Sequence, residues 1–260
     1  MAPTEIAQPA IVATSLAVLE VLRAEAGFVP AVVAGHSLGE YTALVAAGVL
    51  GADEALRLVR RRGELMAGVS RRAAGAMTAV LGLGPGRIEE ICAGCAPLGV
   101  VEIANYNEPG QTVISGQRAA VEEAARLALA AGAERVVALK VSAPFHCSLM
   151  RAIEDEFAAE LERVTFAAPL LPVISSVTGT LVRDGAHARD LLRRQLAGPV
   201  RWVDVLGAAG AHGTGGCLEA PRPGAERLRQ PHRRPLRGAQ HPRRAPHHRA
   251  AARAEAGVRP

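Results

Sequence analysis

A serine lies at the centre of a glycine-flanked pentapeptide, Gly35-His36-Ser37-Leu38-Gly39. An apolar run, residues 31–34, precedes it, and a helix-forming run, residues 40–47, follows it. A strand, a tight turn and a helix in this order expose a serine hydroxyl at a helix N-terminus, where backbone N–H groups can receive an oxyanion. Glycine suits both flanks because such a strained turn leaves no room for neighbouring side chains. We interpret Ser37 as a candidate nucleophile, and the alternative is a structural Gly-Ser turn.

A serine hydroxyl is a poor nucleophile unless a base takes its proton, and histidine is the usual base. Five of the eight histidines lie at or beyond His212 and His187 falls in a polar segment, so two candidates remain. His36 lies inside the turn, where its side chain is expected to point away from the serine. His146 follows a predicted strand in a proline-bearing segment, residues 142–147, of the kind that displays functional side chains. His146 is therefore the predicted general base, with a buried structural histidine as the alternative.

An arginine falls on the apolar side of a predicted helix, residues 53–66, for which Asp53 is the expected N-cap. At about 100° per residue, Arg62 falls among the apolar residues, whereas three other arginines project from the opposite side. A buried charge must be paired. The partner would be an acidic side chain in a structural ion pair, or a substrate carboxylate, which a planar guanidinium can bind with two parallel hydrogen bonds. The helical wheel alone leaves both interpretations open.

The elements that must position these residues alternate between strands and helices. The sequence predicts strands at 76–81, 100–104, 111–115 and 135–139, a turn at 107–110, and helices at 87–93 and 118–131. The order strand, helix, strand, strand, helix, strand is typical of a ferredoxin-like subdomain. A helix at 148–163 and a strand at 172–177 follow. We expect an α/β fold in which residues 1–70 and 142–219 form a large domain with a parallel sheet, and residues 71–141 form an inserted ferredoxin-like subdomain.

Composition excludes several classes of protein. With 260 residues, 49% of them hydrophobic, the chain can bury a substantial core. Its four cysteines imply no disulfide framework and fit a reducing cytoplasm, and Cys92-x-x-Cys95 has no second pair to complete a zinc site, so we expect no metal. The apolar stretch Ile11–Leu22 is short and carries polar side chains, which predicts an amphipathic helix and neither a signal peptide nor a membrane span.

The net charge of +5 is unevenly placed along the chain. Residues 221–260 contain eleven Arg and two Glu, so residues 1–220 carry a net charge of −4. That Arg-, Pro- and His-rich tail has no apolar period, and we expect residues 220–260 to be disordered. A nucleic-acid-binding arm is one interpretation of such a segment. We favour the other, a shifted reading frame, and expect no nucleic-acid partner.

Several further motifs occur in order along the chain. They are Arg-Gly-x-x-Met at 62–66, Asn-Tyr-Asn-Glu-Pro-Gly-Gln at 105–111, Pro-Phe-His-Cys at 144–147, Arg-Gln-Leu at 194–196 and Pro-Val-Arg-Trp at 199–202. With the Ser37 pentapeptide and Glu40, they resemble malonyl-CoA:acyl carrier protein transacylases over roughly Ile6 to Trp202. The resemblance implies a large α/β domain with a ferredoxin-like insertion, in agreement with the predicted strand order.

The resemblance also implies a role for each matched position. Ser37 would be the nucleophile and His146 its general base, oriented by the backbone carbonyl of Gln195. Arg62 would bind the free carboxylate of malonate, which favours the substrate-binding interpretation of this arginine over the structural ion pair. The backbone N–H of Leu38 would be one oxyanion donor. Phe145 and Leu38 resemble the malonyl-selective members of the wider acyltransferase family, which implies a preference for malonyl-CoA over methylmalonyl-CoA.

The implied reaction moves a malonyl group from coenzyme A, through a serine ester, to the phosphopantetheine thiol of acyl carrier protein in fatty acid biosynthesis. It needs no metal or redox cofactor, and we expect a cytoplasmic monomer with no membrane partner. One alternative is the acyltransferase component of a polyketide synthase. Another is a serine hydrolase that uses the same serine and histidine, although such enzymes normally place an Asp or Glu between them in the chain.

The sequence departs from the family at both ends. The family opens with a strand and a Gly-Gln-Gly-Ser-Gln-like loop that supplies another oxyanion donor, and this chain begins after that loop. Cys217-Leu218-Glu219 resembles the start of a last core strand, but the basic run replaces the expected Gly-Pro-Gly turn and helix. We therefore expect a truncated start and a frameshifted end, with little activity and poor solubility for the chain as written.

Overall fold

A computed structural model describes residues 3–212, except residues 73 and 142. These residues belong to one compact unit, Met1–Thr214. The predictions for residues 213–219 and for the tail, residues 220–260, lie outside the described residues.

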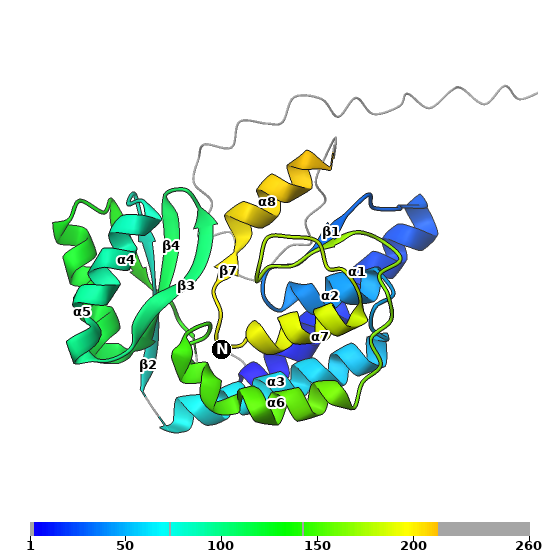
Figure 1. Ribbon diagram of the computed structural model, residues 1–260, viewed down its shortest axis with the longest axis horizontal. Coiled ribbons are helices and arrows are strands. Elements are labelled where there is room, and N and C mark those ends of the chain that lie inside the picture. The colour runs from blue at the N-terminus through cyan, green and yellow to red at the C-terminus, as the bar shows by residue number, and fades with distance from the viewer. Residues whose placement is uncertain (1–2, 73, 142, 213–260) are drawn as a thin grey trace, which may run out of the picture. The chain divides into compact units, whose positions relative to one another are not determined.

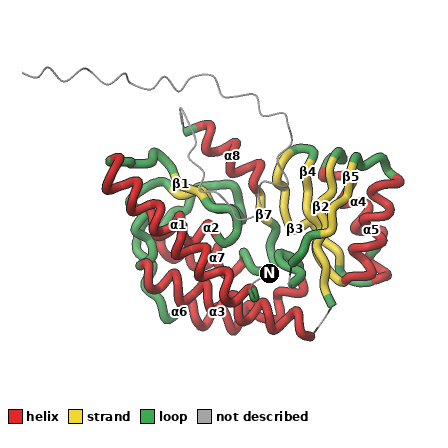
Figure 2. Tube along the Cα trace, turned by 180° about the vertical axis from the view of Figure 1, so that it is seen from behind, coloured by secondary structure: helices red, strands yellow, loops and turns green. Residues whose placement is uncertain are grey.

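One part of this unit is a five-stranded sheet with two helices on one face (Figure 1; Figure 2). In spatial order its strands are β5 (Arg135–Ala138), β2 (Gly75–Leu81), β4 (Gln111–Gln117), β3 (Val101–Glu108) and β7 (Val200–Arg201). The first four pair antiparallel, in the spatial order of a ferredoxin-like fold, and β7 pairs with β3 in parallel. Helices α4 (Pro85–Gly94) and α5 (Arg118–Ala130) cover one face, and a short 3₁₀ helix, η1 (Ala96–Leu98), follows α4. The strand β7, which comes from far along the chain, was not predicted.

The two-residue period of β2 explains how this sheet packs on both faces. Met77, Ala79 and Leu81 belong to one buried cluster, together with residues of β3 and β4. Val80, between them, belongs to the cluster that includes the apolar sides of α4 and α5. Successive side chains of a strand point to opposite faces, so an apolar run of this kind fits a sheet that is covered on both sides.

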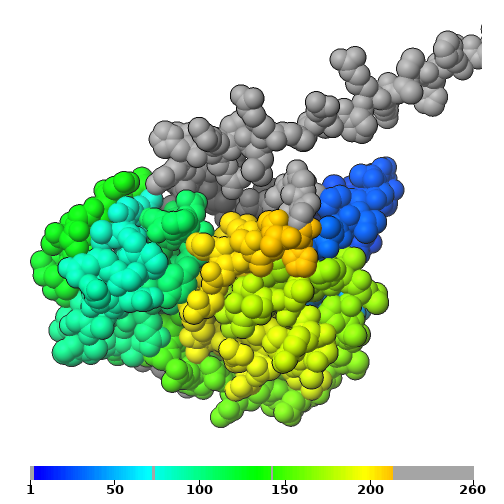
Figure 3. Space-filling model, turned by 45° about the horizontal axis from the view of Figure 1, so that its top comes forward, coloured from blue at the N-terminus to red at the C-terminus, as the bar shows by residue number. Residues whose placement is uncertain are grey.

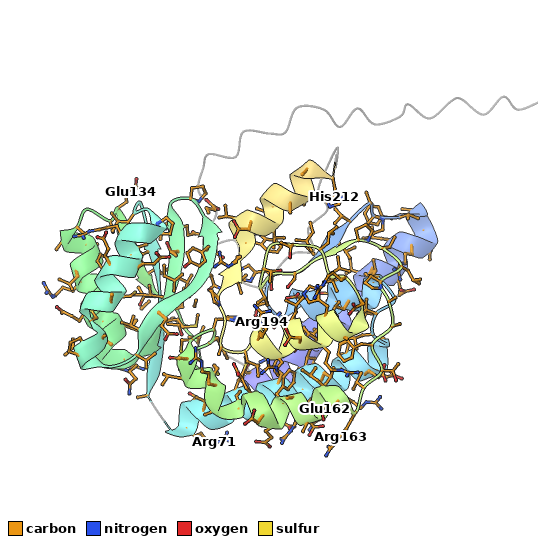
Figure 4. All side chains as sticks on the ribbon, in the orientation of Figure 1. Arg71, Glu134, Glu162, Arg163, Arg194 and His212 are labelled. Carbon is orange, nitrogen blue, oxygen red and sulfur yellow. The ribbon has the colours of Figure 1, made fainter. Side chains whose placement is uncertain are left out.

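The other part of the unit is largely helical and surrounds a short parallel pair of strands, β1 (Val33–Ala34) and β6 (Val173–Ile174). Its helices are α1 (Thr4–Ala26), α2 (Gly39–Ala46), α3 (Ala52–Arg72), α6 (Glu154–Glu162) and α7 (Gly185–Arg194). Their apolar sides form the largest buried cluster, which includes Tyr41, Met66 and Phe157. Figure 4 labels Arg194 at the C-terminal end of α7, one residue before Gln195. Both strands are shorter than the predicted runs at 31–34 and 172–177.

Helix α8 (Trp202–Ala211) links the two parts, since it contacts both β3 and β6. In Figure 3 this orange helix lies between the sheet part and the helical part. Helix α1 packs on α3 and buries Thr4, Gln8 and Val12. It is also long and apolar enough, by length and composition, to cross a membrane.

Other predicted boundaries also differ from those of the structure, and α1 extends beyond the predicted Ile11–Leu22 at both ends. The helix predicted at 53–66 begins at Ala52, and the Glu54 carboxylate accepts the Gly51 N–H, so Asp53 lies inside the first turn and is not the N-cap. The helix predicted at 148–163 is divided into a 3₁₀ segment, η2 (Ser148–Ile153), and α6. Pairing with β4 carries β3 through Glu108, so the turn predicted at 107–110 is confined to its last two residues.

Candidate active site

Ser37 lies in the tight turn between β1 and α2 with a left-handed backbone φ of 52°. A Cβ at Gly35 would lie 1.9 Å from the Gly39 carbonyl carbon, so only glycine fits at Gly35. The N–H groups of Gly39 and Glu40 donate to the carbonyls of His36 and Ser37. Within the described residues, no hydrogen bond uses the Leu38 N–H, which leaves it available to an oxyanion beside Ser37.

His146 is the hydrogen-bond partner of this serine. Its Nε2 lies 2.7 Å from Ser37 Oγ, and its Nδ1 lies 3.0 Å from the Gln195 carbonyl and 3.1 Å from the Gly198 carbonyl. Carbonyl oxygens only accept, so Nδ1 carries the proton and Nε2 is free to take the proton of the hydroxyl. The arrangement is that of a nucleophile and a general base in which two backbone carbonyls orient the base in place of a carboxylate.

Both residues of this pair hold strained backbone angles. His146 has a φ of 59°, and in the described part of the chain only Ser37 and His146 combine a positive φ with a side chain. Such conformations cost roughly 1–3 kcal/mol each and persist where the surroundings enforce them, often at active sites. The sequence pattern indicated this strain at Ser37 but carried no signal for it at His146.

Burial and neighbouring positive groups keep the His146 imidazole neutral. The side chain is buried, and burial, followed by the Arg62 guanidinium and His36, lowers its pKa from 6.5 to about 3. The backbone carbonyls of Gln195 and Gly198 act in the opposite direction but do not offset the burial. The base is therefore in its proton-accepting form across the neutral range.

Arg62 is 3% exposed and points into the same site from α3. Its Nη2 donates to Ser37 Oγ at 3.1 Å and to Gln195 Oε1 at 3.2 Å, and its Nη1 donates to Gln8 Oε1 at 2.7 Å. All three partners are neutral, and none of the ion pairs of the described residues involves this arginine. The structural ion pair left open by the helical wheel is therefore not formed within the described residues.

Two buried polar groups at this position lack a hydrogen-bond partner in the described part of the chain. They are Arg62 Nε and the Tyr41 hydroxyl, and the Arg62 guanidinium carbon lies 5.9 Å from the centre of the Tyr41 ring. Leaving a buried donor unpaired costs about 1–3 kcal/mol, more when it is charged. An anion that accepted from this guanidinium would recover that cost, so the geometry favours a carboxylate ligand next to Ser37.

The side chain of Gln195 joins these groups to a buried acid. Its Nε2 donates to the Ser37 carbonyl at 3.1 Å and to Glu40 Oε2 at 2.7 Å. Glu40 also accepts from Ser176 Oγ at 2.6 Å, and burial raises its pKa. One residue thus contacts the nucleophile, the base and the arginine.

The remaining predicted site residues also lie here. His36 contacts residues other than the serine: its Nε2 lies 2.9 Å from Asn107 Oδ1, and its ring meets Trp202 edge-on at 5.3 Å between ring centres. Phe145 is half-buried and packs against both the large core and one face of the sheet, and Leu38 is partly buried against the large core.

Sequence reasoning assigned no role to the side chains of Gln8, Glu40, Tyr41 and Ser176. A signal existed for Gln8, because Thr4 and Gln8 are polar residues one turn apart on the buried side of α1 and hydrogen bond to each other at 2.9 Å. Glu40 and Tyr41 closely follow the central serine of the turn, but their partners lie far along the chain, Ser176 and Gln195 for Glu40 and Arg62 for Tyr41, and no local pattern shows these contacts.

Comparison with known proteins places these features in a family. A family model described as an acyl transferase domain matches residues 1–237. Over 206 residues the chain is 43% identical to the malonyl CoA-acyl carrier protein transacylase of Salmonella typhimurium, covering 79% of this chain and 67% of the relative. It is 40% identical to the Bacillus subtilis protein of the same name over 208 residues, covering 80% and 65%.

Solved structures give the same result. A Vibrio cholerae acyl carrier protein S-malonyltransferase matches with a TM-score of 0.78 and 44% identity, covering 81% of this chain and 69% of that one. A malonyl-transacylase in complex with a type II polyketide synthase acyl carrier protein matches with a TM-score of 0.80 and 40% identity, covering 82% and 69%.

Proposed function

This chain belongs to the acyl transferase domain family, and we propose that it moves a malonyl group from coenzyme A to acyl carrier protein through an ester on Ser37. The observation that carries the proposal is the buried Arg62, whose Nη2 lies 3.1 Å from Ser37 Oγ and which has no acidic partner within the described residues. A malonyl group has a reactive thioester carbonyl at one end and a free carboxylate at the other. Ser37 would attack the thioester carbonyl, and Arg62 would bind the free carboxylate.

The first half of the reaction acylates the serine. Ser37 Oγ attacks the thioester carbonyl carbon while His146 Nε2 takes the hydroxyl proton, and the resulting oxyanion accepts from the Leu38 N–H. The carbon–sulfur bond then breaks, and the imidazolium returns its proton to the departing thiolate of coenzyme A. The product is a malonyl ester of Ser37 in which the carboxylate is bound by Arg62.

The second half reverses these steps with a different thiol. The phosphopantetheine thiol of acyl carrier protein gives its proton to His146 and attacks the ester carbonyl, and Ser37 Oγ leaves and is reprotonated by the imidazolium. The proposed chemistry needs no metal or redox cofactor. Fatty acid biosynthesis is the pathway that we propose. A related transacylase was solved in complex with a polyketide synthase acyl carrier protein, and this observation favours the supply of malonyl groups to polyketide synthesis as the second candidate function.

The setting of the reaction is also a proposal. We place the protein in the cytoplasm, as a monomer without nucleic-acid or membrane partners. Although α1 is apolar enough to cross a membrane, its Gln8 accepts from Arg62 at 2.7 Å, which supports a place for this helix within the folded unit. Phe145, next to the base, supports the proposed preference for malonyl over methylmalonyl groups, because bulk there disfavours an α-methyl branch.

A transfer assay with two substrates tests the proposal. The chain is mixed with holo acyl carrier protein and either malonyl-CoA or acetyl-CoA, and the acylated carrier is measured by mass spectrometry. Hydrogen bonds to charged groups are worth about 1.5–3 kcal/mol, so Arg62→Ala should lower the malonyl-to-acetyl rate ratio roughly 10- to 100-fold.

The matched control is Arg60→Ala, which removes an exposed arginine of the same helix that pairs with Glu64. Its rate ratio should equal that of the unmodified chain. An equal loss of malonyl and acetyl transfer in Arg62→Ala would contradict the proposed binding of the malonyl carboxylate by Arg62 and would make this arginine a structural residue.

A further inference from the structure

The two buried charged residues beside Ser37 are held apart by one amide. Among the described residues, Glu40 is the buried acid and Arg62 the buried arginine, with exposed fractions of 1% and 3%. They form no ion pair with each other. Instead, the side chain of Gln195 lies between them, 2.7 Å from Glu40 Oε2 and 3.2 Å from Arg62 Nη2.

The chemistry of its neighbours fixes the orientation of this amide. Gln195 Nε2 faces the Ser37 carbonyl, which only accepts, and Gln195 Oε1 faces the Arg62 guanidinium, which only donates. The donor end of the amide therefore points to Glu40 and the acceptor end to Arg62. An amide aligned in this way is polarised at both ends, which strengthens its hydrogen bonds in a water-poor site.

Both hydrogen bonds of the Glu40 side chain can be donated to it, as a carboxylate, which only accepts, requires. Its Oε2 accepts from Ser176 Oγ at 2.6 Å as well as from Gln195 Nε2. Burial raises its pKa, and hydrogen bonds from Ser176, Ser175 and Gln195 oppose that rise. A positive and a negative group in one buried network attract each other far more strongly than they would in water.

We propose that Glu40 is a positioning residue that serves as the counter-charge of Arg62, held one amide away so that the donors of the guanidinium stay available to a substrate carboxylate. This inference rests on the proposed function, in which Arg62 binds malonate. A carboxylate in direct contact would also stabilise the buried guanidinium, but it would occupy the N–H groups that the substrate needs. Within the described residues Arg62 Nε has no hydrogen-bond partner, as expected for a counter-charge kept at a distance.

A charge-removing variant and a charge-swapping variant test this inference in the 260-residue chain. Glu40→Gln keeps an acceptor for Gln195 and removes the charge. The double variant Glu40→Gln/Gln195→Glu keeps one acid and one amide but places the acid directly against Arg62. The backbone carbonyl that orients His146 is present in both, because a side-chain substitution leaves it in place.

The readouts are the single-turnover rates of acyl-enzyme formation with malonyl-CoA and with acetyl-CoA, together with the melting temperature. Interaction energies between residues of one hydrogen-bond network correspond to effects of about 2- to 150-fold. Because Glu40→Gln removes the counter-charge that holds the Arg62 guanidinium in place, it should lower the malonyl-to-acetyl ratio by about tenfold. In the double variant the melting temperature should approach that of the unmodified chain while the malonyl-to-acetyl ratio stays low. A merely structural role for Glu40 predicts that the melting temperature and the malonyl-to-acetyl ratio recover together.

The outcomes separate this inference from the proposed function. An unchanged ratio in Glu40→Gln, or full recovery of the ratio in the double variant, overturns the inference, and the latter decides the question if Glu40→Gln does not fold. The proposed function would still stand if Arg62→Ala lowered the same ratio. Failure of the unmodified chain to form any malonyl-enzyme would overturn both.

Discussion

Ser37, His146 and Arg62 form one hydrogen-bonded group, and the proposed mechanism gives each side chain a distinct chemical role. The 2.7 Å contact between Ser37 Oγ and His146 Nε2 provides a path for the proton, and Arg62 approaches the same oxygen at 3.1 Å. The carbonyls of Gln195 and Gly198 fix the imidazole tautomer without adding a charge. The base therefore lacks the carboxylate that stabilises an imidazolium in a Ser-His-Asp triad, in keeping with its low pKa.

The pKa of His146 leads to a prediction about pH. The imidazole is neutral from the neutral range down to about pH 3, so the rate of serine acylation should show no inflection near its ordinary pKa of 6.5. Because the folded pKa lies below the unfolded one, the unfolded chain binds more protons between these values, and the contribution of His146 to stability is complete above pH 6.5 and is lost as the pH falls toward 3.

Single-turnover acylation by malonyl-CoA, measured from pH 5 to 8, checks this prediction. The expected rate is flat over that range. A fall that fits a single group with a pKa near 6.5 would show that the base is solvated in the free enzyme and that burial does not control its titration.

At the scale of elements, the turn between β1 and α2 depends on its first glycine. Strand, turn and helix were predicted here from the apolar run and the two glycines, because backbone sterics allow few alternatives. The N-cap of α7 carried a similar local signal, since Asp184 accepts the His187 N–H, but this helix was not predicted. Strand β7, which was not predicted, contains two residues, too few for a period to be visible in the sequence.

Substitution of the two glycines that flank the turn should have opposite effects. In Gly35→Ala the added carbon would lie 1.9 Å from the Gly39 backbone, and overpacking of this kind costs typically about 1–3 kcal/mol of the free energy of unfolding. In Gly39→Ala the added carbon meets nothing within 4 Å and lies in helix α2, so stability should stay the same or rise. Urea denaturation of both variants measures the difference. Equal destabilisation of the two variants would mean that the backbone of Gly39 does not approach residue 35 as closely as described above.

At the scale of the whole described unit, the site is assembled from segments that are far apart in the chain. Gln195 donates to the carbonyl of Ser37 across 158 positions, and His146 and Ser37 are separated by 109. Local periodicity predicted most helices and the four antiparallel strands, but it carries no information about which distant side chains meet. Residue patterns alone singled out Ser37, His146 and Arg62, and the resemblance added Gln195 and the carboxylate-binding role of Arg62. The side-chain network through Glu40, Ser176 and Gln8 emerged only from the packing of segments that are distant in the chain.

The central claim is that Ser37 carries the malonyl group between two thiols. The most direct measurement is the intact mass of the chain after mixing with malonyl-CoA, for the unmodified protein and for Ser37→Ala, with melting curves to confirm that both are folded. We predict that after prolonged mixing the unmodified chain gains the mass of one malonyl group, that Ser37→Ala gains none, and that acyl carrier protein removes the group. A malonyl adduct that persists in Ser37→Ala, or transfer to the carrier protein by that variant at the unmodified rate, would contradict the account.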